Sequence, residues 1–98
     1  MSRPRSADNV FRAIADPTRR RMLDLLQKGE RTVGDLIGTL NLRKSAATFH
    51  LGALIGAGLV RQRRRGRHLL CCLDPRGLLT AHAWLGRYAA QQTRQPQR

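Results

Sequence analysis

Apolar residues recur every three or four positions in five stretches of the 98-residue chain, the spacing that puts them on one side of an α-helix. Asp16-Pro17 and Asp74-Pro75 each combine an N-capping side chain with a proline at the first helical position. Thr32 and Asp35 have the spacing of a capping box, and Gly58 follows a predicted helix end. The pattern predicts helices over residues 7–15, 17–28, 33–40, 44–57 and 75–92.

Two shorter stretches between the last two predicted helices are typical of β-strands. They cover residues 59–63 and 67–73, around a turn at Arg64-Arg65-Gly66. A short helix, a turn at Asn41, a second helix and a basic strand–turn–strand follow the order of a winged helix-turn-helix, which puts one helix into the DNA major groove. The predicted fold class is mostly α with a small β-hairpin: about five helices plus a two-stranded wing. One domain is expected over residues 7–92, with disordered tails at 1–6 and 93–98.

The chain is strongly basic, with 19 Lys and Arg against 6 Asp and Glu and a net charge of +13. The excess is uneven, because residues 36–98 contain 11 basic side chains and one acidic side chain, Asp74. This asymmetry puts a positive field on the half with the fourth predicted helix and the hairpin, and it predicts double-stranded DNA as the partner. A non-specific nucleic-acid-binding or architectural protein is the alternative that the same charge allows.

Other classes of protein are not indicated. The sequence has no apolar run of about 18 residues and no signal-like segment, so we expect no membrane attachment. Two adjacent cysteines are not a disulfide framework, which favours a reducing, cytoplasmic location. Because no carboxylate pair, nucleophile–base set or phosphate loop is visible, we expect no catalytic residues and no enzyme. His50, His68 and His82 lack the spacing of a helical metal site, so we expect no metal and no cofactor.

The fourth predicted helix carries the candidate residues for reading bases. Lys44 can donate to guanine, and the hydroxyls of Ser45 and Thr48 can donate or accept. Phe49 either contacts thymine methyl groups or packs against the protein. His50 has a phosphate-contacting or packing role. The candidate DNA-binding residues of this helix are Arg43, Lys44, Ser45, Thr48, Phe49 and His50.

The predicted hairpin carries five arginines within seven residues. Strand alternation sends Arg61, Arg63 and Arg65 to one side, and Gly66 permits a tight turn whose tip can approach a minor groove or flanking phosphates. Arg19 and Arg20, near the start of the second predicted helix, are further candidate phosphate contacts. The candidate DNA-binding residues of the hairpin are Arg61, Arg63, Arg64, Arg65 and Arg67.

Cys71 and Cys72 are consecutive in the second predicted strand, so their side chains are expected to point to opposite faces. This geometry does not favour chelation of one ion or a disulfide between them. One of the two is expected to be a small buried hydrophobe beside Leu69 and Leu73. A thiol-responsive repressor, with Cys71 and Cys72 as redox residues, is an alternative hypothesis.

Five segments, in this order and spacing, resemble the ArsR/SmtB family of small dimeric winged-helix transcriptional repressors. The segments are DPTRRRMLDLL (16–26), TVGDL (32–36), FHLGALIGAGLV (49–60), RRGRHL (64–69) and LDP (73–75). The resemblance implies a homodimer formed through the first and last helices, with one recognition helix in each major groove. It also implies that an inducer or thiol chemistry lowers the affinity for the operator, and the sequence does not identify that inducer.

The chain departs from the family pattern in its third, fourth and last predicted helices. The third predicted helix lacks the Cys-x-Cys motif of metal-sensing members, and the last helix has only His82 where other members place Asp and His ligands. Arg43 stands where members usually have a capping serine, so Asn41 or Ser45 is expected to cap the fourth helix. Polar or basic residues usually occupy the positions of Phe49 and Gly52.

The leading hypothesis is a sequence-specific, dimeric transcriptional repressor that binds a palindromic operator and lacks the family's metal sites. Besides the non-specific and thiol-responsive alternatives, the chain can be an interaction module that keeps the fold without operator binding. A preference for one palindrome over competitor DNA separates a repressor from a non-specific binder.

Overall fold

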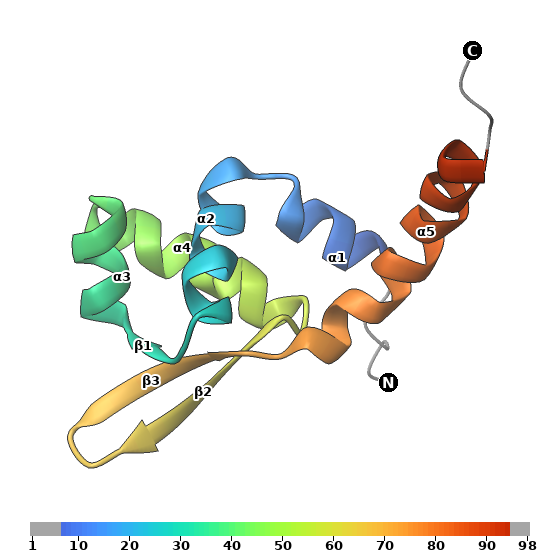
Figure 1. Cartoon of the computed structure of the whole chain (residues 1–98). Coiled ribbons are helices and arrows are strands. Elements are labelled where there is room, and N and C mark those ends of the chain that lie inside the picture. Colours follow the sequence, from blue (N-terminus) through green and yellow to red (C-terminus); the bar gives the residue numbers. More distant parts are fainter. Residues whose placement is uncertain (1–6, 95–98) are drawn as a thin grey trace, which may run out of the picture.

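The computed structural model describes residues 7–94 as five α-helices, a short 3-10 helix and a three-stranded sheet (Figure 1). This architecture confirms the predicted winged helix-turn-helix. In chain order the elements are α1 (Ala7–Ile14), α2 (Pro17–Gln27), β1 (Arg31–Thr32), α3 (Val33–Leu40), α4 (Lys44–Gly56), β2 (Val60–Arg65), β3 (His68–Leu73), η1 (Pro75–Leu78) and α5 (Leu79–Arg94).

The capping residues act as the sequence predicts. The Asp16 carboxylate accepts a hydrogen bond from the backbone N–H of Arg19 at the start of α2 (3.1 Å). Thr32 and Asp35 form a complete capping box on α3, with bonds of 3.0 and 3.1 Å. Asn41 ends α3 in the left-handed conformation, with φ of 55°. These caps fix where α2 and α3 begin and end, and so fix the turn that leads into α4.

The sheet has the order β1-β3-β2, with both pairs antiparallel. The wing, formed by β2 and β3, turns at Gly66-Arg67 rather than at the predicted Arg64-Arg65-Gly66, because pairing continues to Arg65 opposite His68. Gly66 has a φ of +60°, which suits the first position of a two-residue hairpin loop. The additional strand β1 pairs with β3 through only two residues, a length too short to leave a pattern in the sequence.

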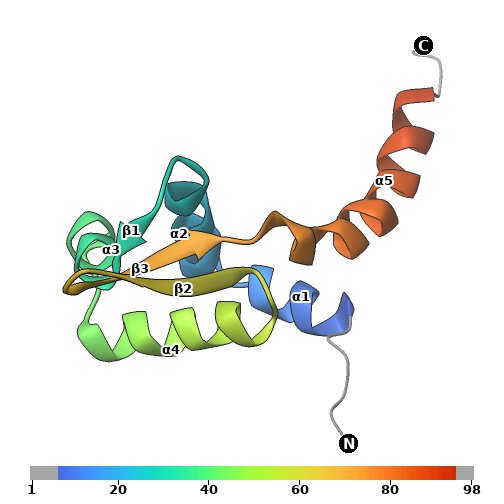
Figure 2. The ribbon, with the colours of Figure 1, turned by 90° about the horizontal axis from the view of Figure 1, so that it is seen from below.

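The core lies where the helices meet the inner face of the sheet. Its fully buried side chains come from α2, α3, α4, both wing strands and the α4–β2 connection. Helix α4 packs through Ala47, Leu51 and Leu54 and runs alongside the wing, with its first turn at the same end of the molecule as the turn of the wing (Figure 2). The large side chains that are fully buried are Met22, Leu36, Leu54, Leu59, Val60 and Cys71.

The predicted last helix is divided into two parts. Asp74 caps η1, accepting from the backbone N–H of Arg76 (3.2 Å), and α5 then continues to Arg94, two residues past the predicted end. Residues 1–6 and 95–98 of the predicted tails lie outside the described residues. Within residues 7–94, no helix is long and apolar enough to cross a membrane.

The close approach of η1 to the connection between α4 and β2 depends on Gly77. A Cβ atom at this position would lie 2.5 Å from the carbonyl oxygen of Gly58 and 2.7 Å from a methyl carbon of Leu59. Both distances are shorter than any real carbon contact, and a backbone oxygen is one of the obstacles. We therefore expect Gly77→Ala to lower the free energy of unfolding by about 1–3 kcal/mol, the usual effect of overpacking. Urea unfolding measures this as a lower midpoint with an unchanged slope.

Gly38→Ala is the matched control for Gly77→Ala. Gly38 is exposed in the middle of α3, and a Cβ there meets nothing within 4 Å. Alanine at this helical position should raise stability by about 0.4–1 kcal/mol, because it restricts the unfolded chain. Equal effects of the two substitutions would contradict the packing of η1 described above.

Candidate nucleic-acid interface

Helix α4 separates a core face from an outer face by its helical period. Ala47, Leu51 and Leu54 are buried. Ser45, Phe49 and Gly52, at positions i, i+4 and i+7, lie on the opposite side and are exposed. The candidates Lys44 and Thr48 are also exposed. The side chains expected to read bases are therefore open to a partner along the first half of the helix.

The N-terminus of α4 has no side-chain cap. Arg43 occupies the N-cap position without a capping hydrogen bond, so the expectation that Asn41 or Ser45 caps this helix is wrong. Asn41 instead ends α3, while Ser45 already lies inside the first turn of α4. That turn contains no acidic residue, and Lys44 adds a positive charge near the positive end of the helix dipole. This arrangement does little for an isolated helix, but it favours an anion such as a DNA phosphate.

The side chain of Phe49 is 67% exposed, so it does not pack into the core. Two neighbours hold its ring. The Arg19 guanidinium carbon lies over the ring, 5.6 Å from its centroid. The His50 ring meets it edge-on, with 5.4 Å between centroids and an interplanar angle of 66°. The ring is thus fixed on one side and open on the other.

His50 connects α4 to the start of α2. Its Nδ1 accepts a hydrogen bond from Arg19 Nε at 3.1 Å, and it lies 3.8 Å from an Asp16 carboxylate oxygen. The pKa of Asp16 is lowered, chiefly because the backbone N–H of Arg19 donates to its carboxylate, with a smaller contribution from His50. These contacts fit the packing role of His50, and its contact with a phosphate stays a prediction.

The two candidate arginines at the start of α2 both bond within the chain. Arg19 also donates to the carbonyl of Arg12 (3.3 Å). Arg20 donates to the carbonyls of Ile14 and Ala15 (2.9 and 3.0 Å), at the C-terminal end of α1. Both side chains therefore fasten α1 to α2, and any contact with DNA would have to share guanidinium groups already engaged.

The strand register puts Arg61, Arg63 and Arg65 on one face of β2, as alternation predicts. Arg63 forms a two-point ion pair with Glu30, with distances of 2.8 Å from Nε and 2.7 Å from the second nitrogen. The hydrogen bonds from Arg63 are the main cause that lowers the pKa of Glu30 to about 2. Glu30 thus holds Arg63 against the sheet.

A second carboxylate binds the base of the wing. Asp74 is buried and accepts from Arg76 at 3.0 and 2.9 Å, and it lies 3.4 Å from Arg61 Nε. Its pKa falls to about 2, chiefly because Arg76 donates to it. Of the five hairpin candidates, Arg63 is therefore paired with Glu30, while Arg61 shares Asp74 with Arg76.

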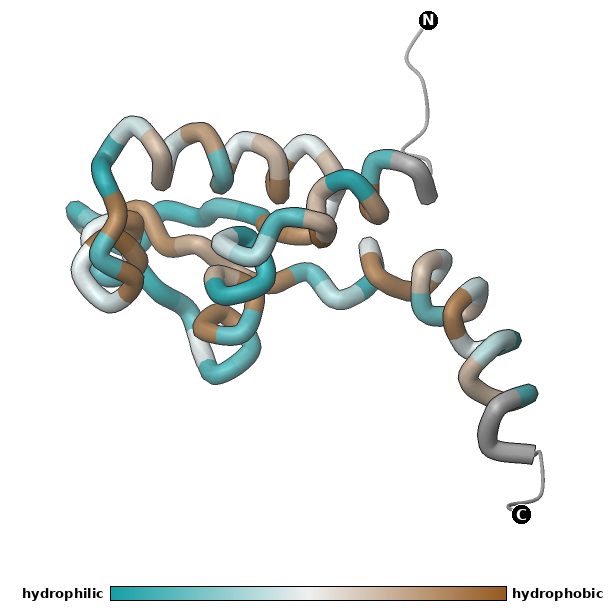
Figure 3. The backbone as a smooth tube through the Cα atoms, turned by 90° about the horizontal axis from the view of Figure 1, so that it is seen from above, coloured by the Kyte–Doolittle hydropathy of each residue, from teal (hydrophilic) through white to brown (hydrophobic). Residues whose placement is uncertain are grey.

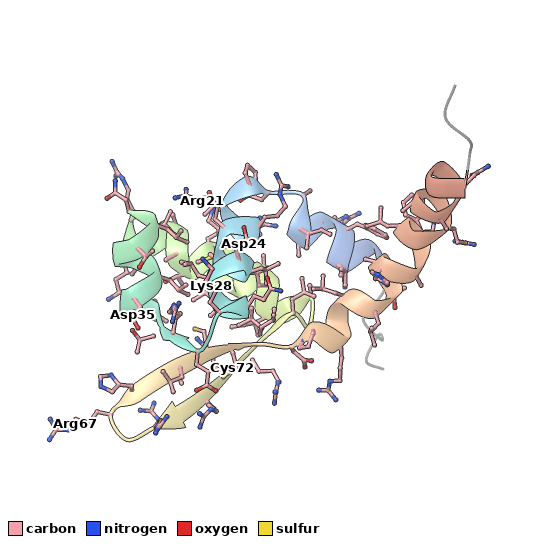
Figure 4. All side chains as sticks on the ribbon, in the orientation of Figure 1. Arg21, Asp24, Lys28, Asp35, Arg67 and Cys72 are labelled. Atoms are coloured by element: carbon pink, nitrogen blue, oxygen red, sulfur yellow. The ribbon has the colours of Figure 1, made fainter. Side chains whose placement is uncertain are left out.

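The remaining three arginines lie at the wing tip, which we define as residues 64–67. Among the described side chains, those of residues 9–91, no carboxylate forms a salt bridge with Arg64, Arg65 or Arg67, and all three arginine side chains are exposed. Arg67 points away from the body of the molecule (Figure 4), and β2 is mostly hydrophilic up to the turn, whereas β3 is largely hydrophobic (Figure 3). The unpaired positive charge of the hairpin is thus concentrated at its far end.

The cysteines occupy opposite faces of β3, as alternation predicts. Cys71 is buried, and Gln62 Nε2 donates to its sulfur at 3.6 Å. Cys72, near the middle of the sheet (Figure 4), donates to a Glu30 oxygen at 3.0 Å. Burial is the largest cause that raises the pKa of both thiols, and Glu30 raises that of Cys72 further. Both environments disfavour the thiolate, which is the reactive form.

The sequence alone does not show that Glu30 and Asp74 pair with some of the wing arginines and leave the others unpaired. Glu30 is separated from Arg63 by 33 residues, and the two meet because β1 pairs with β3. Asp74 was expected only as a cap, and that role hides its contact with Arg61. Within residues 7–94, no group of three or more His, Cys, Asp or Glu side chains is placed to hold a metal ion.

Comparisons with known proteins agree with this geometry. Residues 14–63 match a family described as a helix-turn-helix domain. The transcriptional repressor SdpR of Bacillus subtilis is 37% identical over 78 residues, which are 80% of this chain and 87% of that protein. An ArsR-like transcriptional regulator from Rhodococcus sp. RHA1 has a similar structure, with a TM-score of 0.78 and 29% identity, over 89% of this chain and 80% of that chain.

A third similar protein is Mb0332 of Mycobacterium bovis, described as a homodimeric winged helix-turn-helix DNA-binding domain and a possible ArsR-family regulator. Its TM-score is 0.70 at 28% identity, over 89% of this chain and 81% of that chain. The uncapped start of α4, the basic wing tip and these similarities of sequence and structure support one conclusion. The chain belongs to the ArsR/SmtB family of winged helix-turn-helix proteins, and it is a DNA-binding transcriptional regulator.

Proposed function

We propose that the chain is a dimeric repressor that binds a palindromic operator, with α4 in the major groove and the wing tip against flanking phosphates. The observation that supports this proposal is the division of the wing arginines into those that pair with a carboxylate and those that do not. Arg61 and Arg63 form salt bridges with carboxylates, whereas Arg64, Arg65 and Arg67 form none with the described side chains and lie at the same end of the molecule as the uncapped start of α4 (Figure 2). Such a regulator meets its operator in the cytoplasm.

The last helix supports the dimeric part of the proposal. Ala81, Trp84, Leu85 and Tyr88 have the spacing of a single helix face, yet only Ala81 is buried among the α5 side chains described through Gln91. Trp84 also contacts Phe11 of α1, with 5.4 Å between ring centroids. The apolar face therefore continues beyond the core, and α1 and α5 together offer a surface that a second copy can cover, which agrees with the homodimeric state of the similar protein Mb0332.

Binding in competition tests the central claim. A repressor should prefer one pseudo-palindrome, with half-sites about one helical turn apart, over bulk DNA by about 10³-fold or more at fixed salt. Selection of bound fragments from genomic DNA supplies the candidate operator. Equal affinity for all sequences would instead support a non-specific architectural protein.

Replacement of Arg64, Arg65 and Arg67 by Ala should weaken binding to operator and bulk DNA alike. Contacts with phosphates carry no sequence information, and each one lost should reduce the slope of log K against log salt by about 0.9. Titrations at several salt concentrations measure this slope. A loss confined to the operator would mean that the wing tip reads bases.

Two further variants serve as controls for the wing tip. The double substitution Glu30→Gln and Arg63→Gln removes an ion pair without changing the net charge, and it should leave the slope unchanged. The double substitution Arg21→Ala and Lys28→Ala lowers the charge on the exposed face of α2 and should also leave the slope nearly unchanged. A slope that depends only on net charge would contradict the assignment of the wing tip.

Leu85→Glu should convert the dimer to a monomer, because it puts a charge into the apolar face of α5, where Leu85 is 48% exposed. Sedimentation at micromolar concentration measures the change. Gln27→Glu alters the charge equally on the exposed face of α2 and should leave the dimer intact. A wild-type protein that sediments only as a monomer would refute the dimeric proposal.

A further inference from the structure

Phe49 is a large apolar side chain placed where the fold does not need it. It lies on the outer face of α4 and is 67% exposed. One turn later, Gly52 has no side chain, and a Cβ there would meet nothing within 4 Å. The free side of the ring therefore has an unobstructed approach from outside the protein.

The contacts of Phe49 fix the ring without covering it. Arg19 lies over the ring at 5.6 Å, and Arg19 is itself held by its hydrogen bonds to His50 Nδ1 and the Arg12 carbonyl. His50 supports the ring edge-on at 5.4 Å. A solvent-exposed phenylalanine without such partners would sample several rotamers, whereas this one is held in a defined position before any partner arrives.

The chemistry of the major groove limits what such a ring can recognise. Nearly every group on the base edges is a hydrogen-bond donor or acceptor, and the apolar exception is the C5-methyl group of thymine. A phenyl ring can neither donate nor accept a conventional hydrogen bond. It can therefore gain from burying a C5-methyl group, and it loses where it would cover an unpaired polar edge.

We propose that Phe49 reads the C5-methyl group of a thymine in each half-site, and that Arg19 is the positioning residue for its ring. This inference rests on the proposed operator recognition and adds the chemical group that one side chain reads. It also accounts for Gly52, since a larger side chain one turn after Phe49 would compete with the base for the same space.

Replacement of each operator thymine by deoxyuridine tests the proposal, because the exchange removes only the C5-methyl group. In the wild type, one symmetry-related thymine in each half-site should be sensitive, with affinity falling about fourfold for each methyl removed, the change that corresponds to one buried methylene. Phe49→Ala should bind thymine and deoxyuridine operators equally. 5-Methylcytosine paired with guanine at the sensitive position should bind the wild type more tightly than cytosine does.

Two variants separate this role from general effects on binding. Lys44→Gln changes another exposed residue of α4 and should keep the wild-type ratio between thymine and deoxyuridine operators. Arg19→Lys keeps the charge but loses the planar guanidinium that donates to His50 and lies over the ring. It should lower that ratio, which the loss of a phosphate contact would not do, because phosphate contacts carry no sequence information.

The outcomes distinguish this proposal from operator recognition itself. If the wild type prefers its operator but no thymine is sensitive, the methyl reading by Phe49 is overturned and operator recognition stands. If the wild type and Phe49→Ala are equally sensitive, another group reads the methyl and the proposal also fails. An unchanged ratio in Arg19→Lys overturns the positioning role alone. Without any preferred operator, both this inference and the proposed function are refuted.

Discussion

Helix α4 must present one face to the protein core and the opposite face to a binding partner, and the rest of the molecule is arranged around this constraint. Ala47, Leu51 and Leu54 are buried, so they fix the rotation of the helix about its axis. Once that rotation is fixed, Ser45 and Phe49 can lie only on the outer face. The capped ends of α2 and α3 and the strand that follows α4 hold the helix from both ends. A slip of one residue in α4 would bury polar side chains and expose leucines at the same time.

The second constraint is the scarcity of negative charge. With 6 acidic against 19 basic residues, most arginines cannot be paired within the chain, so the positions of the few carboxylates determine where positive charge remains available. Glu30 and Asp74 both lie toward the base of the wing, and they engage Arg63, Arg61 and Arg76 there. Among the wing arginines, those without a salt bridge to a described carboxylate lie at the wing tip. A protein of this charge needs such sorting to give its DNA contacts a direction, because net charge alone attracts nucleic acid to every surface.

The sequence predicts the parts of this fold that depend on local chemistry. Asp16-Pro17, the Thr32–Asp35 capping box and Asp74-Pro75 act on backbone groups within three residues, so their effects can be foreseen. The ion pair of Glu30 with Arg63 and the contact of Arg19 with Phe49 join residues more than 29 positions apart, and no periodicity encodes them. For the same reason, the exposed basic residues of the sequence identify the candidate interface but do not show which of its arginines already pair with carboxylates.

Short backbone contacts connect the end of α4 to the start of the last helix. The backbone N–H of Asp74 donates to the carbonyl of Leu59 (2.7 Å), and the N–H of Leu59 donates to the carbonyl of Leu54 in α4 (2.9 Å). Gly77 of η1 lies against the carbonyl of Gly58 at the same place. The start of α5 is thus tied by backbone contacts to the end of α4, with little flexible chain between them. In a dimer held through α5, this junction sets the separation and tilt of the two recognition helices, and therefore the half-site spacing that the pair can span.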